Sequence, residues 1–183
     1  MIGNDIVDLN LAKTQSNWQR KGFLEKQFTR QEQDEIWQSE NPFLKVWLFW
    51  SMKEAAYKCH VQESQERFFA PKKISCKIVS NKNGFVKIKN KKYYLNYLLS
   101  KSYIYSVAAI TNDFKMVSES FFITKNDCST KIINKKLLSY FPLETQLKKN
   151  ELGIPYLYQQ NEKMPISISK SHHGNYGAFA FSI

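Results

Sequence analysis

Alternating and helical spacings of apolar residues predict a chain that begins with a strand followed by helices. Residues 2–9 alternate weakly and are rich in β-branched side chains, which is typical of a short strand. Residues 18–38 are expected to be helical, with an interruption near Thr29, where T-R-Q-E forms a capping-box pattern. A longer helix is expected from Pro42, capped by Asn41, to about residue 61. Its buried stripe is formed by apolar residues at helical spacing: Leu44, Trp47, Leu48, Ala55 and Cys59.

The middle of the chain has the pattern of strands. Residues 74–79 and 85–99 are predicted to be strands on either side of the turn sequence N-K-N-G at 81–84. The apolar run 103–111 predicts a buried strand, and residues 118–124 are expected to add another.

The last third is expected to follow a polar linker at 125–131. It should contain a helix over 131–140 and a strand that starts at the G-I-P-Y-L segment, 153–157. A final hairpin is expected to pair 165–170 with 176–183 across His172, His173, Gly174 and Asn175. The whole pattern predicts an α+β fold with mostly antiparallel pairing.

Composition favours an ordered, globular protein of the cytoplasm. The chain has 183 residues, of which 43% are hydrophobic, and it holds 13 Phe, 10 Tyr and 4 Trp, which argues against disorder. No apolar run approaches the roughly 18 residues of a membrane helix, and the start, MIGNDIVDLN, lacks the basic region of a signal peptide. Three cysteines without a C-x-x-C spacing fit a reducing compartment.

The positive charge of the chain points to an anionic partner. The 27 Lys and Arg residues exceed the 16 Asp and Glu residues, which gives a net charge of +11. Residues 70–110 contain nine lysines and no acid. Such a surface attracts nucleic acid, anionic lipid, a phosphorylated cofactor or an acidic protein, although an ordinary solvated lysine face explains part of it equally well.

The first candidate site segment is Gly3-Asn4-Asp5-Ile6. An acid inside an apolar strand is costly unless a cation or hydrogen-bond donor meets it, so Asp5 is a candidate functional residue. Asp8 lies three positions further on, on the other side of a strand, and one of the two acids is expected to cap the next segment. The alternative for Asp5 is a hydrated acid at a strand edge.

The second segment runs from Trp50 to Lys58. Glu54 and Lys58 are four residues apart on one helix face, at the flank of the buried stripe, which is where the rim of a cleft is expected. The alternative is an ordinary helix ion pair. Lys53 projects opposite the stripe, so it is expected at the surface unless a partner or a phosphate covers it.

The third segment is Ser169-Lys170-Ser171-His172. A strand end with hydroxyl, imidazole and turn amides suits phosphate oxygens, and the alternative is a polar hairpin turn. His172 and His173 are adjacent and should point apart, so no zinc site is expected.

In this order, the three segments resemble the 4'-phosphopantetheinyl transferase superfamily. That family shows G-x-D-I, then W-x-x-K-E-A-x-x-K, then S-x-S-H, and residues 50–58 carry every fixed letter of the middle motif. The G-I-P-Y-L segment is similar to the family's G-x-P strand. The resemblance covers both ends and the first third of the chain, and it is diffuse between about 70 and 152.

The resemblance implies an enzyme that moves the phosphopantetheine arm of coenzyme A onto a serine of a carrier protein. Asp5 and Glu54 would hold Mg²⁺, and Glu54, or a water that it holds, would accept the serine proton. Lys58 would bind the phosphate under attack. Ser171 and His172 would bind another phosphate, and Lys53 is included among the residues expected to bind coenzyme A. The basic surface would attract an acidic acyl or peptidyl carrier protein.

The implied fold is an antiparallel sheet packed on a long helix. Residues 1–124 resemble the metal-bearing half of the two-lobed branch, and residues 131–183 resemble a shortened second half, in one compact unit with a pseudo-twofold relation. A monomer would then suffice. However, Val7 stands where some relatives carry a second carboxylate, and Asp8 matches the short holo-acyl-carrier-protein-synthase branch, whose site lies between subunits of a homotrimer.

Two other functions fit parts of the sequence. One is a catalytically silent homologue that only binds carriers or coenzyme A. The other is a nucleic-acid-binding module that uses residues 87–101, where lysines interleave with Tyr93, Tyr94 and Tyr97. No nucleic-acid-binding motif accompanies that stretch and it leaves the three segments unexplained, so no nucleic-acid partner is expected.

Overall fold

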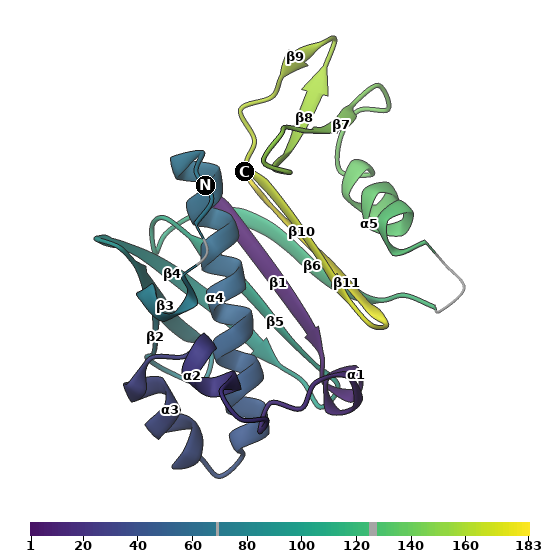
Figure 1. Cartoon of the computed structure of the whole chain (residues 1–183). Coiled ribbons are helices and arrows are strands. Elements are labelled where there is room, and N and C mark those ends of the chain that lie inside the picture. Colours follow the sequence, from purple (N-terminus) through teal and green to yellow (C-terminus); the bar gives the residue numbers. More distant parts are fainter. Residues whose placement is uncertain (69, 125–127) are drawn as a thin grey trace.

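The computed structural model describes residues 1–68, 70–124 and 128–183, and three antiparallel sheets and five α-helices dominate this part (Figure 1). The α-helices are α1 (Leu9–Gln15), α2 (Phe23–Gln27), α3 (Arg30–Trp37), α4 (Pro42–Ser64) and α5 (Ser129–Leu138), and a short 3₁₀ helix, η1 (Pro71–Lys73), follows α4. The strands are β1 (Ile2–Asp8), β2 (Ile74–Ile78), β3 (Asn83–Ile88), β4 (Lys91–Leu99), β5 (Tyr103–Ala109), β6 (Met116–Phe122), β7 (Gln146–Lys149), β8 (Pro155–Gln159), β9 (Glu162–Lys163), β10 (Ile168–His173) and β11 (Tyr176–Ser182). The predicted α+β class with antiparallel pairing is confirmed.

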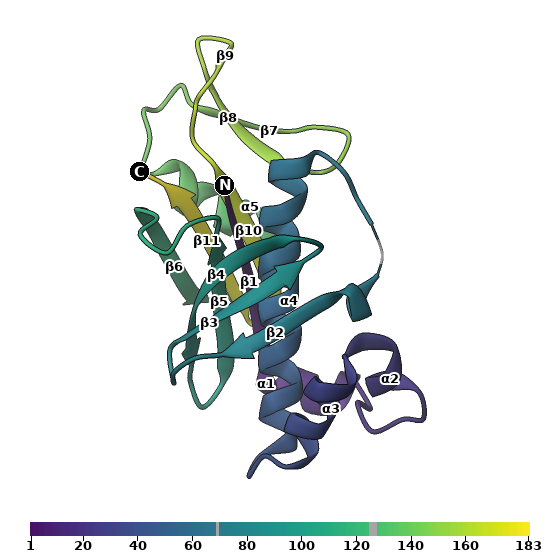
Figure 2. The ribbon, with the colours of Figure 1, turned by 90° about the vertical axis from the view of Figure 1, so that its left-hand side faces the viewer.

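The largest sheet has five strands in the order β1-β5-β4-β3-β2, and α4 lies along one of its faces (Figure 2). The helix begins where the sequence predicts, with Asn41 as cap and Pro42 in the first turn. The capping box of α3, between Thr29 and Glu32, is also confirmed. Apolar side chains between α4 and the sheet form the main core.

The prediction of one strand over 85–99 is wrong, because this segment turns back on itself. Strand β3 ends at Ile88 and β4 begins at Lys91, and Lys89 adopts a left-handed conformation with φ 53° in the turn. The buried positions are even-numbered in β3 and odd-numbered in β4. The change from even to odd buried positions indicates a turn, although the short connection, residues 89–90, contains neither glycine nor proline.

A glycine allows β1 to approach α4 closely. A Cβ at residue 3 would overlap the carbonyl oxygen of Ala55 and the backbone nitrogen of Cys59. The strand and the helix therefore touch backbone to backbone, which brings residues 4 and 5 of β1 against the middle of α4.

The second sheet, β10-β11-β6, lies beside β1 and is joined to it by side chains. The amides of Ile2 and Asn4 donate to Ser167 Oγ and Ser169 Oγ, each at 2.9 Å, and the amide of Asp8 donates to His173 Nδ1 at 2.9 Å. Side chains of residues 167, 169 and 173 thus accept three backbone amides along the edge of β1 that faces away from β5.

The remaining elements complete the second part of the molecule. Helix α5 packs on the second sheet in a separate core, and the third sheet, β7-β8-β9, lies near the end of α4 (Figure 1). Strand β6 pairs with β11, so a strand from the predicted first half, 1–124, belongs to the sheet of the predicted second half. Of the predicted linker, 125–131, residues 125–127 lie outside the described residues, whereas residues 129–131 form the first turn of α5 rather than a linker. None of the described helices is long and apolar enough to cross a membrane.

The predicted position of Lys53 at the surface is wrong. Its side chain is buried, and Nζ lies 2.7 Å from Glu32 Oε2 and donates to the carbonyl oxygens of Gln27 and Pro71 at 2.8 and 3.1 Å. Lys53 is buried because α4 is covered on other faces besides the one that packs on the sheet. Around Lys53 these faces contact α2, α3, η1 and β2. Glu32 also accepts from the amide of Cys76 at 2.7 Å, so the ion pair between α3 and α4 also holds α2, η1 and β2 in place.

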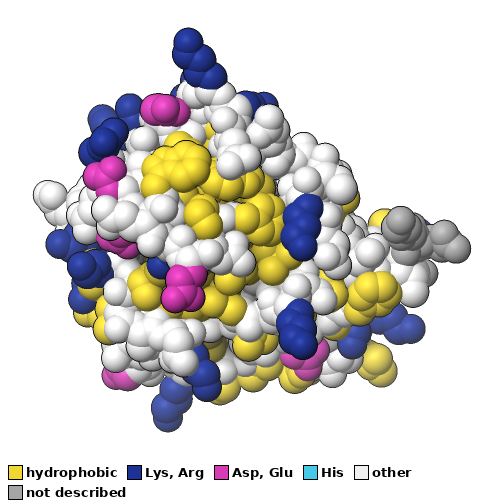
Figure 3. Space-filling view, turned by 90° about the horizontal axis from the view of Figure 1, so that it is seen from below, with side chains coloured by type: hydrophobic (Ala, Val, Ile, Leu, Met, Phe, Trp, Pro, Cys, Tyr) yellow, Lys and Arg dark blue, Asp and Glu magenta, His cyan; other side chains and the backbone are white. Residues whose placement is uncertain are grey.

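One end of the molecule carries an apolar surface patch (Figure 3). Apolar residues that are at least partly exposed at this end include Trp37 of α3, Phe43 of α4 and Trp18 of the loop before α2, and the rings of Trp18 and Trp37 are in contact at a centroid distance of 5.4 Å. Trp37 is 55% exposed. Trp50, at the inner side of this group, stacks on Phe23.

Loss of the buried ammonium should destabilise the protein strongly. In Lys53→Met, Glu32 would keep a buried charge without its counter-ion, so we expect the free energy of unfolding in urea to fall by about 3–5 kcal/mol. The matched control is Arg30→Met, which removes the exposed α3 pair of Arg30 with Asp34 and should cost less than about 0.5 kcal/mol. Equal stabilities of the two variants would contradict the structural role assigned to Lys53.

Candidate active site

Asp5, Glu54 and Lys58 come together where β1 crosses the middle of α4. Lys58 Nζ lies 3.0 Å from Asp5 Oδ1 and donates to the carbonyl oxygen of Asn4 at 2.8 Å. Ser51, one turn before Glu54 on the same helix, contacts the Asp5 carbonyl at 3.5 Å and Ser106 of β5 at 2.9 Å. The glycine contact at residue 3 fixes this geometry, since it sets the distance between strand and helix.

The two carboxyl groups of this cluster are in an unfavourable electrostatic setting. Burial raises the pKa of Asp5, and the ammonium of Lys58 only partly opposes this. Burial also raises the pKa of Glu54, and the charge of Asp5 raises it further. Two carboxylates therefore share one ammonium, and an additional cation would relieve the excess of negative charge.

Asp8 has a different and structural role. Its Oδ1 accepts from the amides of Asn10 and Leu11 at 2.9 and 3.1 Å and so caps α1, as expected for one of the two acids. Its Oδ2 accepts from the amide of Asn175 at 3.0 Å. Gly174 sits against this carboxylate with φ 55°, and a Cβ there would overlap it. Asp8 thus fastens the β10–β11 turn to the end of β1.

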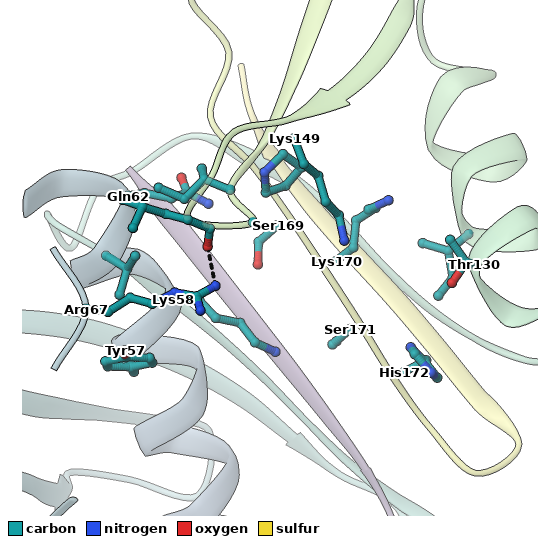
Figure 4. Close-up of a pocket in the computed structure, with 16 residues that line it drawn as sticks. Tyr57, Lys58, Gln62, Arg67, Thr130, Lys149, Ser169, Lys170, Ser171 and His172 are labelled. Atoms are coloured by element: carbon teal, nitrogen blue, oxygen red, sulfur yellow. Dashed lines mark hydrogen bonds between the residues drawn. The ribbon is translucent and has the colours of Figure 1, made fainter. Parts of the chain in front are cut away.

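A basic cleft of about 400 Å³ opens beside the cluster, between α4, α5, β10 and the loop before β8 (Figure 4). Lys58 and Arg67 lie on one side and Lys149 and Lys170 on another (Figure 4), and no acid is among the described residues that line it. Arg67 donates to the carbonyl oxygen of Leu152. Burial, with the nearby charge of Lys149, lowers the pKa of Lys170 to about 8. Such a cleft is suited to a ligand that carries several negative charges.

The structure places Ser171 and His172 at this cleft in different ways. Ser171 is buried and its Oγ accepts from Asn4 Nδ2 at 3.0 Å, whereas His172 is exposed and lines the cleft. Both belong to β10, so the turn of the hairpin is shorter than predicted and consists of Gly174 and Asn175. His173 accepts the Asp8 amide on the neighbouring face, so the two histidines do not converge.

Comparison with known families identifies the first part of the chain. The family model described as the 4'-phosphopantetheinyl transferase superfamily matches residues 1–114. The chain belongs to this superfamily. Comparison with curated proteins gives no significant match. Of the cluster and cleft residues, Asp5, Glu54, Lys58 and Arg67 lie within the matched region, whereas Lys149, Lys170, Ser171 and His172 lie beyond it.

Phosphopantetheinyl transferases use coenzyme A as substrate and typically a divalent metal, for which Asp5 and Glu54 are the nearest carboxylate donors. Among the described residues, no group of three or more His, Cys, Asp or Glu side chains could hold one. Asp5 and Glu54 nevertheless offer carboxylate oxygens with a charge excess, and Mg²⁺ commonly binds through one or two carboxylates plus water and substrate phosphates. The pair fits such an ion. Val7 packs in the main core, so the strand supplies no third carboxylate there.

Three cations of this transferase's cleft were not predicted as site residues from the sequence: Arg67, Lys149 and Lys170. Lys170 stands inside the S-x-S-H segment, so its position could have been noticed. Arg67 follows α4 and Lys149 ends β7, and neither belongs to a motif or a periodic pattern. Only the tertiary structure brings them to one cleft.

Removal of the Glu54 charge should stabilise the metal-free protein at neutral and higher pH. Because folding raises the pKa of Glu54, the native state binds a proton more readily than the unfolded state, and stability is lost as the pH rises through the native pKa. In chelator, Glu54→Gln should therefore unfold at higher urea concentration than the wild type at pH 8, and the difference should vanish near pH 4. The control is Glu40→Gln at an exposed position, where no pH-dependent difference is expected. A Glu54→Gln protein less stable than the wild type at pH 8 would contradict the electrostatic account.

Proposed function

We infer that this protein transfers the 4'-phosphopantetheine arm of coenzyme A to a serine of an apo carrier protein and releases 3',5'-ADP, with the help of Mg²⁺. The observation that carries the inference is the position of the Asp5–Glu54 carboxylate pair, which borders a cleft lined by cations and by none of the described acids. A metal-bridged pyrophosphate next to further phosphate groups needs this combination of charges.

Coenzyme A is a suitable occupant of the cleft. Its pyrophosphate and its ribose phosphate carry several negative charges, which Lys58, Arg67, Lys149 and Lys170 would compensate. The cleft volume of about 400 Å³ lies within the range of ligand sites, roughly 300–1,000 Å³. Lys53 is left out of this set, because its ammonium is bound to Glu32 and two carbonyl groups.

The reaction joins the carrier serine to the pantetheine-side phosphorus of coenzyme A. The serine Oγ forms the new P–O bond while the anhydride bond to 3',5'-ADP breaks. Asp5 and Glu54 would hold Mg²⁺, which would neutralise charge on the transferred phosphoryl group. Glu54 would accept the serine proton, directly or through water. Lys58 would bind the phosphate under attack, and His172 with Ser171 another phosphate.

An acidic carrier protein suits the surface around this site. The chain has a net charge of +11, and an apolar patch lies at the end of the molecule where α4 begins (Figure 3). The partly buried Trp50 lies one helical turn before Glu54 on the same helix. Apolar contacts surrounded by complementary charges are typical of a protein interface. The nucleic-acid alternative loses support, because Tyr93 and Tyr97 are buried and cannot stack on bases.

Both walls of the proposed site come from one chain. Lys58 and Arg67 lie in or near α4, whereas Lys149 and Lys170 come from β7 and β10. This supports a two-lobed enzyme that works as a monomer rather than a homotrimer with sites between subunits. Sedimentation at assay concentration, with coenzyme A and Mg²⁺, should give a single species of about 21.6 kDa. A trimer that dissociates with loss of activity on dilution would contradict the single-chain site.

Transfer itself is tested by the intact mass of an apo acyl carrier protein incubated with this protein, coenzyme A and Mg²⁺. We expect a gain of one phosphopantetheine arm, which chelator abolishes. Glu54→Gln should lower the rate at least about 100-fold, because general-base catalysis contributes about that much. The control Glu40→Gln should keep the wild-type rate.

Three other results would change the conclusion. A folded protein that binds coenzyme A but modifies none of several carriers would be a silent homologue. If the protein neither binds coenzyme A nor modifies a carrier, the cleft serves another anion. Normal turnover in Glu54→Gln would remove Glu54 from the mechanism.

A further inference from the structure

The ammonium group of Lys58 occupies a position where a metal ion would meet Asp5. It lies 3.0 Å from Asp5 Oδ1 and 2.8 Å from the Asn4 carbonyl oxygen, and these contacts use two of its three N–H donors. The Asp5 side chain is only 13% exposed. The described residues give Asp5 a single ion pair, with Lys58, so this ammonium is its counter-ion in the ligand-free protein.

The same lysine also belongs to the cleft. Its side chain is 31% exposed, more than twice the fraction of its partner, and it lines the cleft together with Arg67 and Lys149 (Figure 4). A lysine stem is flexible, so the ammonium can reach either the carboxylate or a phosphate in the cleft, but it cannot fully serve both. The structure shows it on the carboxylate.

The charges of the cluster favour an exchange. Asp5 and Glu54 contribute two negative charges and Lys58 one positive charge, which leaves an excess of one negative charge. A divalent cation at the carboxylates would reverse this sign and repel the nearby ammonium. An anion in the cleft would attract the ammonium and leave Asp5 without its counter-ion.

We propose that Lys58 is a mobile counter-ion that holds Asp5 in the ligand-free protein and moves to a phosphate when a divalent cation enters at Asp5 and Glu54. The idea rests on the proposed function and adds a coupling between its two ligands. While the Lys58 ammonium is on Asp5, it competes with the cation and is unavailable to the polyanion. Either ligand favours its release from Asp5, so cation and polyanion bind with positive coupling. The coupling factor is the same whichever ligand binds first.

Metal binding without any carrier protein tests this proposal. The probe is Mn²⁺, an ion that prefers oxygen ligands as Mg²⁺ does, counted in its free form by electron paramagnetic resonance. In the wild type, saturating coenzyme A should tighten Mn²⁺ binding at least about tenfold. In Lys58→Met, Mn²⁺ alone should bind about tenfold more tightly than to the wild type, and the coupling factor should fall several-fold.

The matched control is Lys170→Met. Lys170 lines the same cleft, but its ammonium donates to Asn134 and not to Asp5. Its loss should weaken coenzyme A binding while the affinity for Mn²⁺ alone stays within about twofold of the wild type. Circular dichroism should match the wild type for both variants, and Lys58→Gln is the replacement if Lys58→Met does not fold.

Several outcomes would overturn the proposal. Unchanged or weaker binding of Mn²⁺ to Lys58→Met would show that the ammonium does not compete with the cation. A coupling factor of Lys58→Met equal to that of the wild type would show that coenzyme A does not displace the Lys58 ammonium. Absence of Mn²⁺ binding to the wild type would also overturn the proposal. If transfer to a carrier is seen alongside any of these results, the proposed function stands and only the exchange by Lys58 falls.

Discussion

The backbone contact between β1 and α4 at Gly3 is the constraint on which the site depends. Any side chain at residue 3 would overlap the helix backbone at Ala55 and Cys59. With the two elements at this distance, the Asn4 carbonyl and the Asp5 carboxylate both reach Lys58. The glycine of the G-x-D segment is therefore explained by packing, and the chemistry of the next residues follows from it.

The site combines two charge excesses that the fold keeps apart. Two carboxylates share one ammonium at the crossing of strand and helix, and the adjacent cleft gathers cations without an acid among its described lining residues. Each half is unfavourable alone, as the raised pKa of Glu54 and the lowered pKa of Lys170 indicate. A ligand with a divalent cation and several phosphates would neutralise both the excess negative charge of the carboxylates and the excess positive charge of the cleft. These unfavourable charges are therefore consistent with a binding role.

Much of the fold could be predicted from local patterns, whereas the cleft could not. Asn41, Pro42 and the Thr29–Glu32 box mark helix starts through chemistry that acts within a few residues. Lys53 was misplaced because a single apolar stripe says nothing about what covers the other faces of a helix. Lys149 reaches the cleft only through the pairing of β7 with β8 and the position of that sheet near the end of α4, which no sequence spacing records.

The most direct measurement is a crystal structure of the protein with coenzyme A and Mg²⁺. The account requires the metal on Asp5 and Glu54, the pyrophosphate between that metal and Lys58, and the remaining phosphate among Arg67, Lys149 and Lys170 of the same chain. Coenzyme A bound elsewhere, or phosphates held by residues of a second subunit, would contradict it.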